Sequence, residues 1–175
     1  MTEPWSLDEV PRGALLPDAT LRARWSEALP QILAVAAGET DPVALQATLA
    51  ALLYAALPQA IWCGFYRRVE AETLAVGPYQ GSLGCLRIAL GRGVCGTAAR
   101  TGETQRVPDV EAFPGHIACD SRSRSELVVP VRDAGGEVRA VLDLDAAVYD
   151  GFAPWLAEAL EGLCREVFGD PAVRW

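Results

Sequence analysis

The chain has 175 residues, 51% of them hydrophobic, and its 23 acidic and 15 basic residues give a formal net charge of -8. This length suffices for one domain with a real core, while the negative charge disfavours nucleic acid and anionic membranes, whose phosphates the summed field repels. The absence of Lys and Asn, together with a single His, excludes Schiff-base and P-loop lysines, N-glycosylation and three-histidine zinc sites.

The N-terminal third of the sequence predicts an arm followed by two helices. Residues 1–19 mix Pro, Gly and charge without a period and are expected to lie over the surface as an arm, with a single domain over residues 20–175. Apolar residues at helical spacing from Leu21 predict the first helix, although Pro30 argues against a straight one. An Asp N-cap followed by Pro42 opens the second helix.

The middle of the sequence changes to short apolar runs separated by turn residues, which predicts a sheet. The expected strands span residues 61–67, 73–77, 85–89, 104–107, 126–131 and 138–145. A short helix is expected over residues 94–100, an irregular loop over 108–124, and a last helix from residue 150 to Gly169. Helices at both ends with strands between them indicate an α+β fold, with helices on one face of an antiparallel sheet.

The N-terminal sequence lacks the positive and apolar regions of a signal peptide, and no stretch reaches the roughly 20 apolar residues of a membrane span. We therefore expect a cytoplasmic protein. Its five cysteines are an odd number in a chain with a full core, which fits reduced and reactive thiols better than a secretory disulfide framework.

Three of the cysteines stand in turn-rich sequence: Cys85 in GSLGCLRI, Cys95 in GRGVCGTAA and Cys119 in FPGHIACD. Cys95 is expected at a helix N-terminus and Cys119 follows His116 by three residues, so the helix dipole and nearby cations could hold either as a thiolate. An inert buried thiol is the alternative for each of the three. It is the expected role of Cys63 and Cys164.

A zinc site is a competing interpretation, because Cys85, Cys95, His116 and Cys119 are all zinc-ligand types. The spacing does not favour it: the sequence has no CxxC pair, and the short run from His116 to Cys119 is a lone weak signal. No metal is therefore predicted.

Three acidic residues are expected close together on the pair of strands near the C-terminus. The two-residue period of a strand puts Asp143 and Asp145 on one face, with the leucines between them on the other. A turn centred on residues 134–135 would place Glu126 opposite Asp143, and a turn one residue later would place it opposite Asp145.

Three carboxylates this close together repel one another, so they need a bound cation or a proton. An ammonium ligand or a protonated general acid would explain it, and a solvated outer face is the alternative. Trp62 and Tyr66, four residues apart on the first expected strand, could wall an apolar pocket or belong to an ordinary core.

Four runs of the sequence together resemble the free methionine-(R)-sulfoxide reductases, single-domain proteins of the GAF fold: YQGSLGCLRI, GRGVCGTAA, FPGHIACDSRSRSELVVPV and GGEVRAVLDLD. The resemblance covers nearly the whole domain and is specific, because ordinary GAF sensor domains lack the three cysteines of these motifs. It implies a sheet of about six antiparallel strands, with helices on one face and a closed ligand pocket on the other.

The resemblance also implies roles for individual residues. Cys119 matches the nucleophile, Cys85 its disulfide partner and Cys95 the third redox cysteine, which is an alternative nucleophile. The residues that would line the substrate pocket are Trp62, Tyr66, Glu126, Asp143 and Asp145.

The implied reaction is thiol-dependent reduction of free L-methionine-(R)-sulfoxide to methionine, as a repair of oxidative damage. A Cys119 thiolate attacks the sulfoxide sulfur while a carboxylic acid protonates the departing oxygen. Cys85 condenses with the resulting sulfenic acid to a disulfide, which thioredoxin reduces, without a cofactor. A non-catalytic GAF sensor of a small molecule or of oxidation is the alternative function. The sequence leaves a homodimer open, with Trp5 and Trp175 as candidate contact residues.

Overall fold

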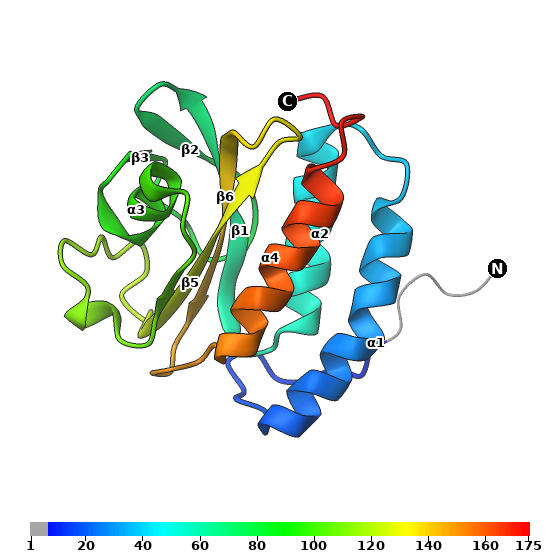
Figure 1. Cartoon of the computed structure of the whole chain (residues 1–175). Coiled ribbons are helices and arrows are strands. Elements are labelled where there is room, and N and C mark those ends of the chain that lie inside the picture. Colours follow the sequence, from blue (N-terminus) through cyan, green and yellow to red (C-terminus); the bar gives the residue numbers. More distant parts are fainter. Residues whose placement is uncertain (1–6) are drawn as a thin grey trace.

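A six-stranded antiparallel sheet divides the molecule into two sides (Figure 1). The computed structural model describes residues 7–175. The sheet order is β3-β2-β1-β6-β5-β4, with strands β1 (Ala60–Glu70), β2 (Thr73–Gly81), β3 (Arg87–Ala89), β4 (Gln105–Val107), β5 (Ser125–Arg132) and β6 (Val138–Ala146). The helices are α1 (Asp18–Ala36), α2 (Pro42–Ala56), α3 (Gly93–Thr101) and α4 (Pro154–Phe168), with a 3-10 turn, η1 (Val110–Ala112), after β4.

The arrangement confirms the predicted α+β fold. The three long helices α1, α2 and α4 lie on one side of the sheet, and the short helix α3 lies on the other side, against β4, β5 and β6 (Figure 1). Every helix and strand expected from the sequence is present, with shifted ends. The largest shift of a strand end is in β2, which continues to Gly81 rather than ending at residue 77. β3 begins at Arg87 rather than at residue 85, so that Cys85 lies in the loop before it.

α1 continues through Pro30 as one helix, so the proline does not end it. Pro30 cannot donate to the carbonyl of Ser26, but both residues are exposed, so water can hydrogen-bond that carbonyl. The arm predicted over residues 1–19 falls in part on residues 1–6, which lie outside the described residues.

The predicted alternation along β6 is confirmed by the two apolar clusters that the sheet separates. Leu142 and Leu144 are fully buried in the larger cluster, between the sheet and the three long helices. Val141 belongs to the second cluster, on the α3 side, together with Trp62 and Tyr66 of β1. The side chains of β6 that alternate with the leucines therefore face the α3 side.

The register of the β5–β6 hairpin follows the later of the two turns considered above. Gly136 has a φ of +86° in the turn, and the Asp133 carboxylate accepts the N–H groups of Gly135 and Glu137. At the turn itself Arg132 pairs with Val138. A register shift between Val131 and Arg132 then sets Glu126 opposite Asp145.

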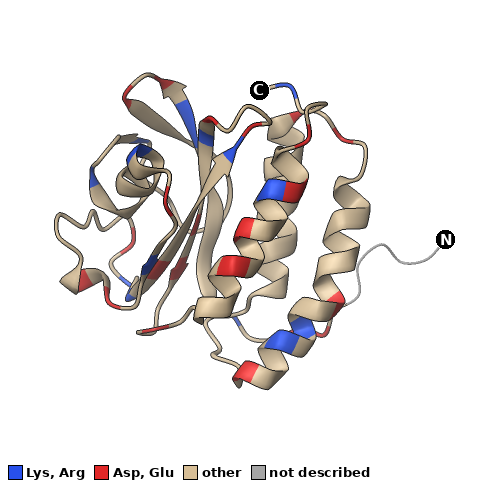
Figure 2. Ribbon diagram, viewed as in Figure 1, with Lys and Arg blue, Asp and Glu red and all other residues tan. Residues whose placement is uncertain are grey.

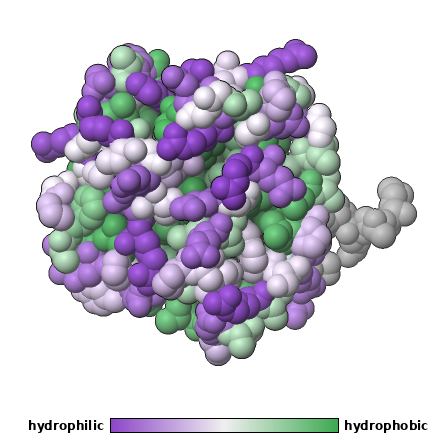
Figure 3. Space-filling view, in the orientation of Figure 1, coloured by the Kyte–Doolittle hydropathy of each residue, from purple (hydrophilic) through white to green (hydrophobic). Residues whose placement is uncertain are grey.

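The outer face of the helical layer is polar. Charged positions recur along α4 on the side away from the sheet (Figure 2), where the exposed residues are Glu158, Glu161, Arg165 and Glu166. In the space-filling view, hydrophilic residues and small apolar patches alternate across this face (Figure 3). None of the helices in the described part of the chain has the length and apolar character that crossing a membrane requires.

Replacement of Gly64 with Ala tests the packing of the central strand. An added Cβ would lie 2.2 Å from the Tyr79 Cβ on β2, so we expect Gly64→Ala to lower the free energy of unfolding by about 3 kcal/mol. The matched control is Gly162→Ala in α4, where no atom lies within 4 Å of the added Cβ, and which should instead stabilise by about 0.5–1 kcal/mol. Urea unfolding of both variants measures the difference, and equal effects would contradict this account.

Candidate active site

A closed pocket lies on the α3 side of the sheet, under two loops. The Cys85 loop (residues 82–86) joins β2 to β3, and the Cys119 loop (residues 113–124) joins η1 to β5. The pocket has a volume of about 20 Å³, and among its lining residues are Tyr66, Cys95, His116, Cys119, Ser123, Glu126, Asp143 and Asp145. This is room for about one water molecule.

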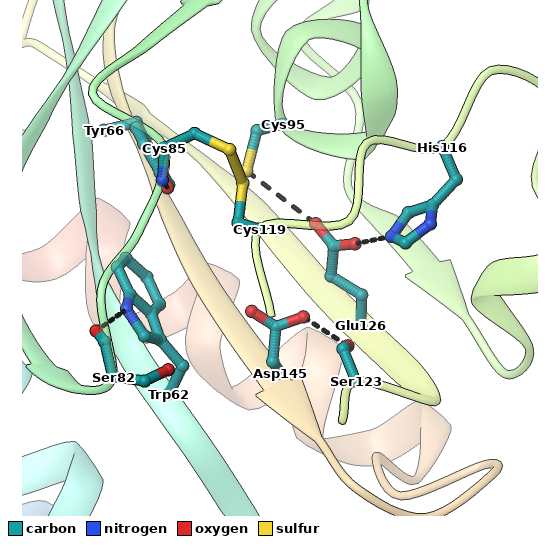
Figure 4. The surroundings of a disulfide bond; sticks show 10 residues. All are labelled: Trp62, Tyr66, Ser82, Cys85, Cys95, His116, Cys119, Ser123, Glu126 and Asp145. Carbon is teal, nitrogen blue, oxygen red and sulfur yellow. Dashed lines mark hydrogen bonds and ion pairs between the residues drawn. A yellow bond between two sulfur atoms is a disulfide. The ribbon is translucent and has the colours of Figure 1, made fainter. Parts of the chain in front are cut away.

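A disulfide between Cys85 and Cys119 joins the two loops across the mouth of the pocket, with the Cα atoms 5.4 Å apart (Figure 4). The pairing implied by the family resemblance is therefore present. A second link runs beside it, from the Ser82 hydroxyl to the Asp120 carboxylate at 2.6 Å. An ion pair and hydrogen bonds with Arg122 hold the pKa of Asp120 well below its usual range.

Of the three free cysteines, Cys63 and Cys164 are buried in the helix-side cluster, as the sequence predicts. Burial raises the pKa of the Cys164 thiol to about 12 and raises that of Cys63 as well. Both are packing residues, because burial in the apolar core disfavours the reactive thiolate.

Cys95 is buried against the acidic residues of the pocket. It is the third residue of α3, and its Sγ donates a hydrogen bond to Glu126 Oε1 at 3.8 Å (Figure 4). Burial, Asp143 and Glu126 raise the pKa of the Cys95 thiol well above its ordinary value. The expectation that the helix N-terminus makes Cys95 a thiolate is therefore wrong in this state, since desolvation and neighbouring carboxyls outweigh the helix dipole.

The three acids predicted from the hairpin meet in the pocket. Glu126 and Asp143 are only 6% and 5% exposed, so a solvated outer face is ruled out for them. Burial, with the charge of Asp145, raises the pKa of both well above the ordinary value. This shift favours the neutral, protonated form of both carboxyls.

Asp145 differs from the other two acids. Burial raises its pKa to about 6, while a hydrogen bond from the Ser123 hydroxyl, at 2.6 Å, acts to lower it. At pH 7 Asp145 is therefore mostly an anion, beside two neutral carboxyls. The sequence analysis did not identify Ser123, because only the fold brings its loop next to β6.

His116 contacts Glu126 rather than a cysteine. Its Nε2 lies 3.6 Å from Glu126 Oε2 (Figure 4). The carboxyl group is thus held between the imidazole on one oxygen and the Cys95 thiol on the other. This contact was not foreseen, because the sequence shows His116 near Cys119 but not what its side chain faces.

Three stacked aromatic rings flank the pocket. Trp62 stacks on Tyr66, with ring centroids 5.6 Å apart, and on Tyr79, at 5.3 Å. The Tyr66 hydroxyl accepts the N–H of Cys85 at 3.1 Å, and the Trp62 indole N–H donates to the Ser82 carbonyl at 3.1 Å. The rings predicted to wall a pocket thus also hold the Cys85 loop, and Tyr79 is an additional member that the sequence analysis missed.

The zinc interpretation is not supported by the geometry. Cys85 and Cys119 are bonded to one another, so the four predicted ligands do not assemble. Within residues 7–175, the groups close enough to share a metal ion are Cys95, Glu126 and Asp143, whose ligand atoms lie within 4.8 Å of one another. Burial raises the pKa of all three groups and so favours their protonated forms, whereas a metal ion binds deprotonated ligands.

Comparisons with known proteins point to one family. Residues 41–170 match the GAF domain family. The free methionine-R-sulfoxide reductase of Escherichia coli is 47% identical over 134 residues, which make up 77% of this chain and 80% of that protein. The solved structure of free methionine-R-sulfoxide reductase from Neisseria meningitidis, in complex with its substrate, has a TM-score of 0.80 and 40% identity over 91% of this chain and 93% of that one. The reduced form of the Staphylococcus aureus fRMsr has a TM-score of 0.79 and 37% identity over 84% and 94% of the two chains.

The raised pKa of Asp143 predicts a pH-dependent stability. Between pH 4 and the folded-state pKa, the folded chain keeps a proton that the unfolded chain has released, so stability falls as pH rises, by about 1.4 kcal/mol per pH unit for each such group. Asp143→Asn removes one such group. In urea unfolding, we expect the free energy of unfolding of the variant, relative to that of the unmodified protein, to increase as the pH rises from about 4 towards the folded-state pKa of Asp143.

The control for this measurement is Asp18→Asn. A hydrogen bond from Arg22 lowers the pKa of the exposed Asp18 carboxyl, so this group is ionised in both states above pH 5. The free energy of unfolding of the Asp18→Asn variant should therefore change with pH in the same way as that of the unmodified protein. An Asp143→Asn curve that is also parallel would contradict the protonated state assigned to Asp143.

Proposed function

The chain is a GAF-domain protein of the free methionine-R-sulfoxide reductase family, and we propose that it reduces free methionine-(R)-sulfoxide to methionine. The observation that carries this proposal is the disulfide between Cys85 and Cys119, which closes a pocket containing two neutral carboxyls and one anionic carboxylate. A redox-active pair of thiols, a proton donor and an anion for the substrate ammonium are the three functions that this reaction needs.

Cys119 is the proposed nucleophile. Its thiolate attacks the sulfoxide sulfur, the oxygen passes to Cys119 as a sulfenic acid, and methionine leaves. Cys85 then attacks the sulfenic sulfur, a disulfide forms, and the oxygen departs as water. Burial and a carboxyl-rich environment raise the pKa of Cys95, which argues against Cys95 as the first attacking group and favours Cys119 in its exposed loop.

The pKa directions divide the remaining roles among the three acids. Glu126 and Asp143 hold protons at neutral pH and are suited to protonate the departing oxygen. Asp145, with a pKa of about 6, is suited to bind the substrate ammonium as an anion. Trp62 and Tyr66 supply the aromatic wall for the apolar part of the substrate.

The disulfide form is the form that remains after the reaction. Its pocket of about 20 Å³ holds one water molecule and is too small for an amino acid. Substrate binding therefore requires reduction of the disulfide first, so that the Cys119 loop can move away from the Cys85 loop. We propose thioredoxin as the reductant and the cytoplasm, where thiols stay reduced, as the place of action. The benefit to the cell is repair of oxidised methionine.

A GAF sensor of a small molecule would need the pocket but not the thiols. The bonded Cys85 and Cys119 favour the enzyme over such a sensor. The chain could still act as a homodimer, with Trp175 as a proposed contact residue; Trp5, the other candidate, lies outside the described residues.

Loss of Cys119 tests the proposed nucleophile. Cys119→Ser should abolish reduction of free methionine-(R)-sulfoxide in an assay driven by dithiothreitol, because a hydroxyl neither attacks the sulfur nor forms a disulfide. Cys164→Ala, which alters a buried thiol far from the pocket, should retain turnover. Full activity of Cys119→Ser would transfer the role to Cys95, and equal rates with the S epimer would contradict the proposed substrate.

A thiol titration separates an enzyme from a sensor. The fully reduced chain has five thiols, which can be counted in denaturant before and after addition of one equivalent of free methionine-(R)-sulfoxide. We expect the count to fall by two, because one turnover forms one disulfide. An unchanged count, with ligand binding demonstrated separately, would support the sensor.

A further inference from the structure

Exposed apolar side chains gather around the disulfide. Leu83 and Leu86 are 80% and 74% exposed, the highest values among the large hydrophobic residues of the described chain, and they lie on either side of Cys85. Ile117, 39% exposed, precedes Cys119 by two residues. Because two residues span at most about 7 Å, all three lie within roughly that distance of a Cα of the disulfide. We call these three residues the apolar rim.

Two of the three rim residues, Leu83 and Leu86, have no packing role in the described part of the chain, whereas Ile117 also lines the pocket. Leu83 and Leu86 pack against neither apolar cluster among the described residues. Leu15 and Val35 occur singly, where they need no explanation, and the exposed Val43, Val69 and Trp175 line a separate pocket that contains no cysteine. Three at one place, around a reactive bond, are typical of an interaction surface.

The chemistry of the bond that the apolar rim surrounds identifies the partner. If the chain works as proposed above, the Cys85–Cys119 disulfide must be reduced after every turnover, and this inference rests on that function. A small thiol needs no apolar surface to reach an exposed sulfur. A protein must bring its own thiols into line with the bond, and apolar contacts around the reacting sulfurs provide that orientation.

We propose that the apolar rim is the docking surface for a protein dithiol reductant of the thioredoxin class. Cys119 is exposed whereas Cys85 is partly buried, so the reductant thiolate attacks the Cys119 sulfur. That step forms a mixed disulfide, breaks the bond to Cys85 and releases Cys85 as a thiolate. The second thiol of the reductant then attacks the reductant's own sulfur in the mixed disulfide and releases Cys119. Two electrons pass to the chain, and the reductant leaves as a disulfide.

The test compares two reductants on the oxidised full-length protein, without methionine sulfoxide. The double variant Leu83→Ser/Leu86→Ser should be reduced by thioredoxin, with thioredoxin reductase and NADPH, at least tenfold more slowly than the unmodified protein. Its reduction by dithiothreitol should be unchanged, because that small dithiol needs no docking. The matched control, Leu15→Ser/Val35→Ser, removes two exposed apolar residues elsewhere and should leave both rates unchanged.

The outcomes distinguish the docking surface from the proposed reaction. An unchanged thioredoxin rate in the Leu83→Ser/Leu86→Ser variant, or an equal loss with both reductants, would overturn the docking surface. A dimer that this variant converts to monomer in sedimentation would overturn it in favour of contact with a second copy. Failure to reduce methionine sulfoxide with dithiothreitol would instead count against the proposed function.

The attacked sulfur can be identified separately. A thioredoxin that lacks its second cysteine should remain attached to the oxidised chain as a mixed disulfide. Peptide mass spectrometry should locate the attachment at Cys119. Attachment at Cys85 would contradict the direction of attack.

Discussion

The pairing of β5 with β6 is the constraint on which the pocket depends. This register sets Glu126 beside Asp145, and the alternation along β6 turns Asp143 to the same side. Because that side is covered by α3 and the Cys119 loop, the acids are removed from water together. Desolvation and mutual repulsion then keep Glu126 and Asp143 protonated. The neutral state of Cys95 is a further consequence of the same crowding.

The two loops above the acids combine a covalent link with a non-covalent one. The disulfide between Cys85 and Cys119 belongs to one redox state, whereas the hydrogen bond from Ser82 to Asp120 does not depend on it. The contacts of the Cys85 loop with Trp62 and Tyr66 likewise involve no sulfur atom. These contacts can keep the two thiols near one another while the pocket opens, so that the disulfide can form again after each reaction. The same arrangement leaves Cys119 on the outside, within reach of an external thiol.

Much of the fold was predictable because it rests on local patterns. The apolar alternation of β6 and the capped start of α2, where the Asp41 carboxylate accepts the N–H groups of Val43 and Ala44, depend only on residues near in sequence. The cost of Pro30 inside α1, by contrast, depends on whether the freed carbonyl of Ser26 meets solvent. That is a property of where the helix lies, not of its sequence.

The sequence by itself determined which chemistry is available: three cysteines in glycine-rich loops, three acids at strand spacing and one histidine. Only the tertiary structure decided the state of each group. The position of Cys95 at the start of a helix suggested a thiolate. The pKa of a thiol, however, depends on all the charges around it and on its removal from water. The Cys95 thiol lies beside Glu126 and Asp143, which come from strands β5 and β6. The contact of His116 with Glu126 is likewise a meeting of a loop and a strand. A local sequence pattern shows which residue types are present and which face of a strand they share. The burial and the electrostatic surroundings of a residue depend on the whole fold.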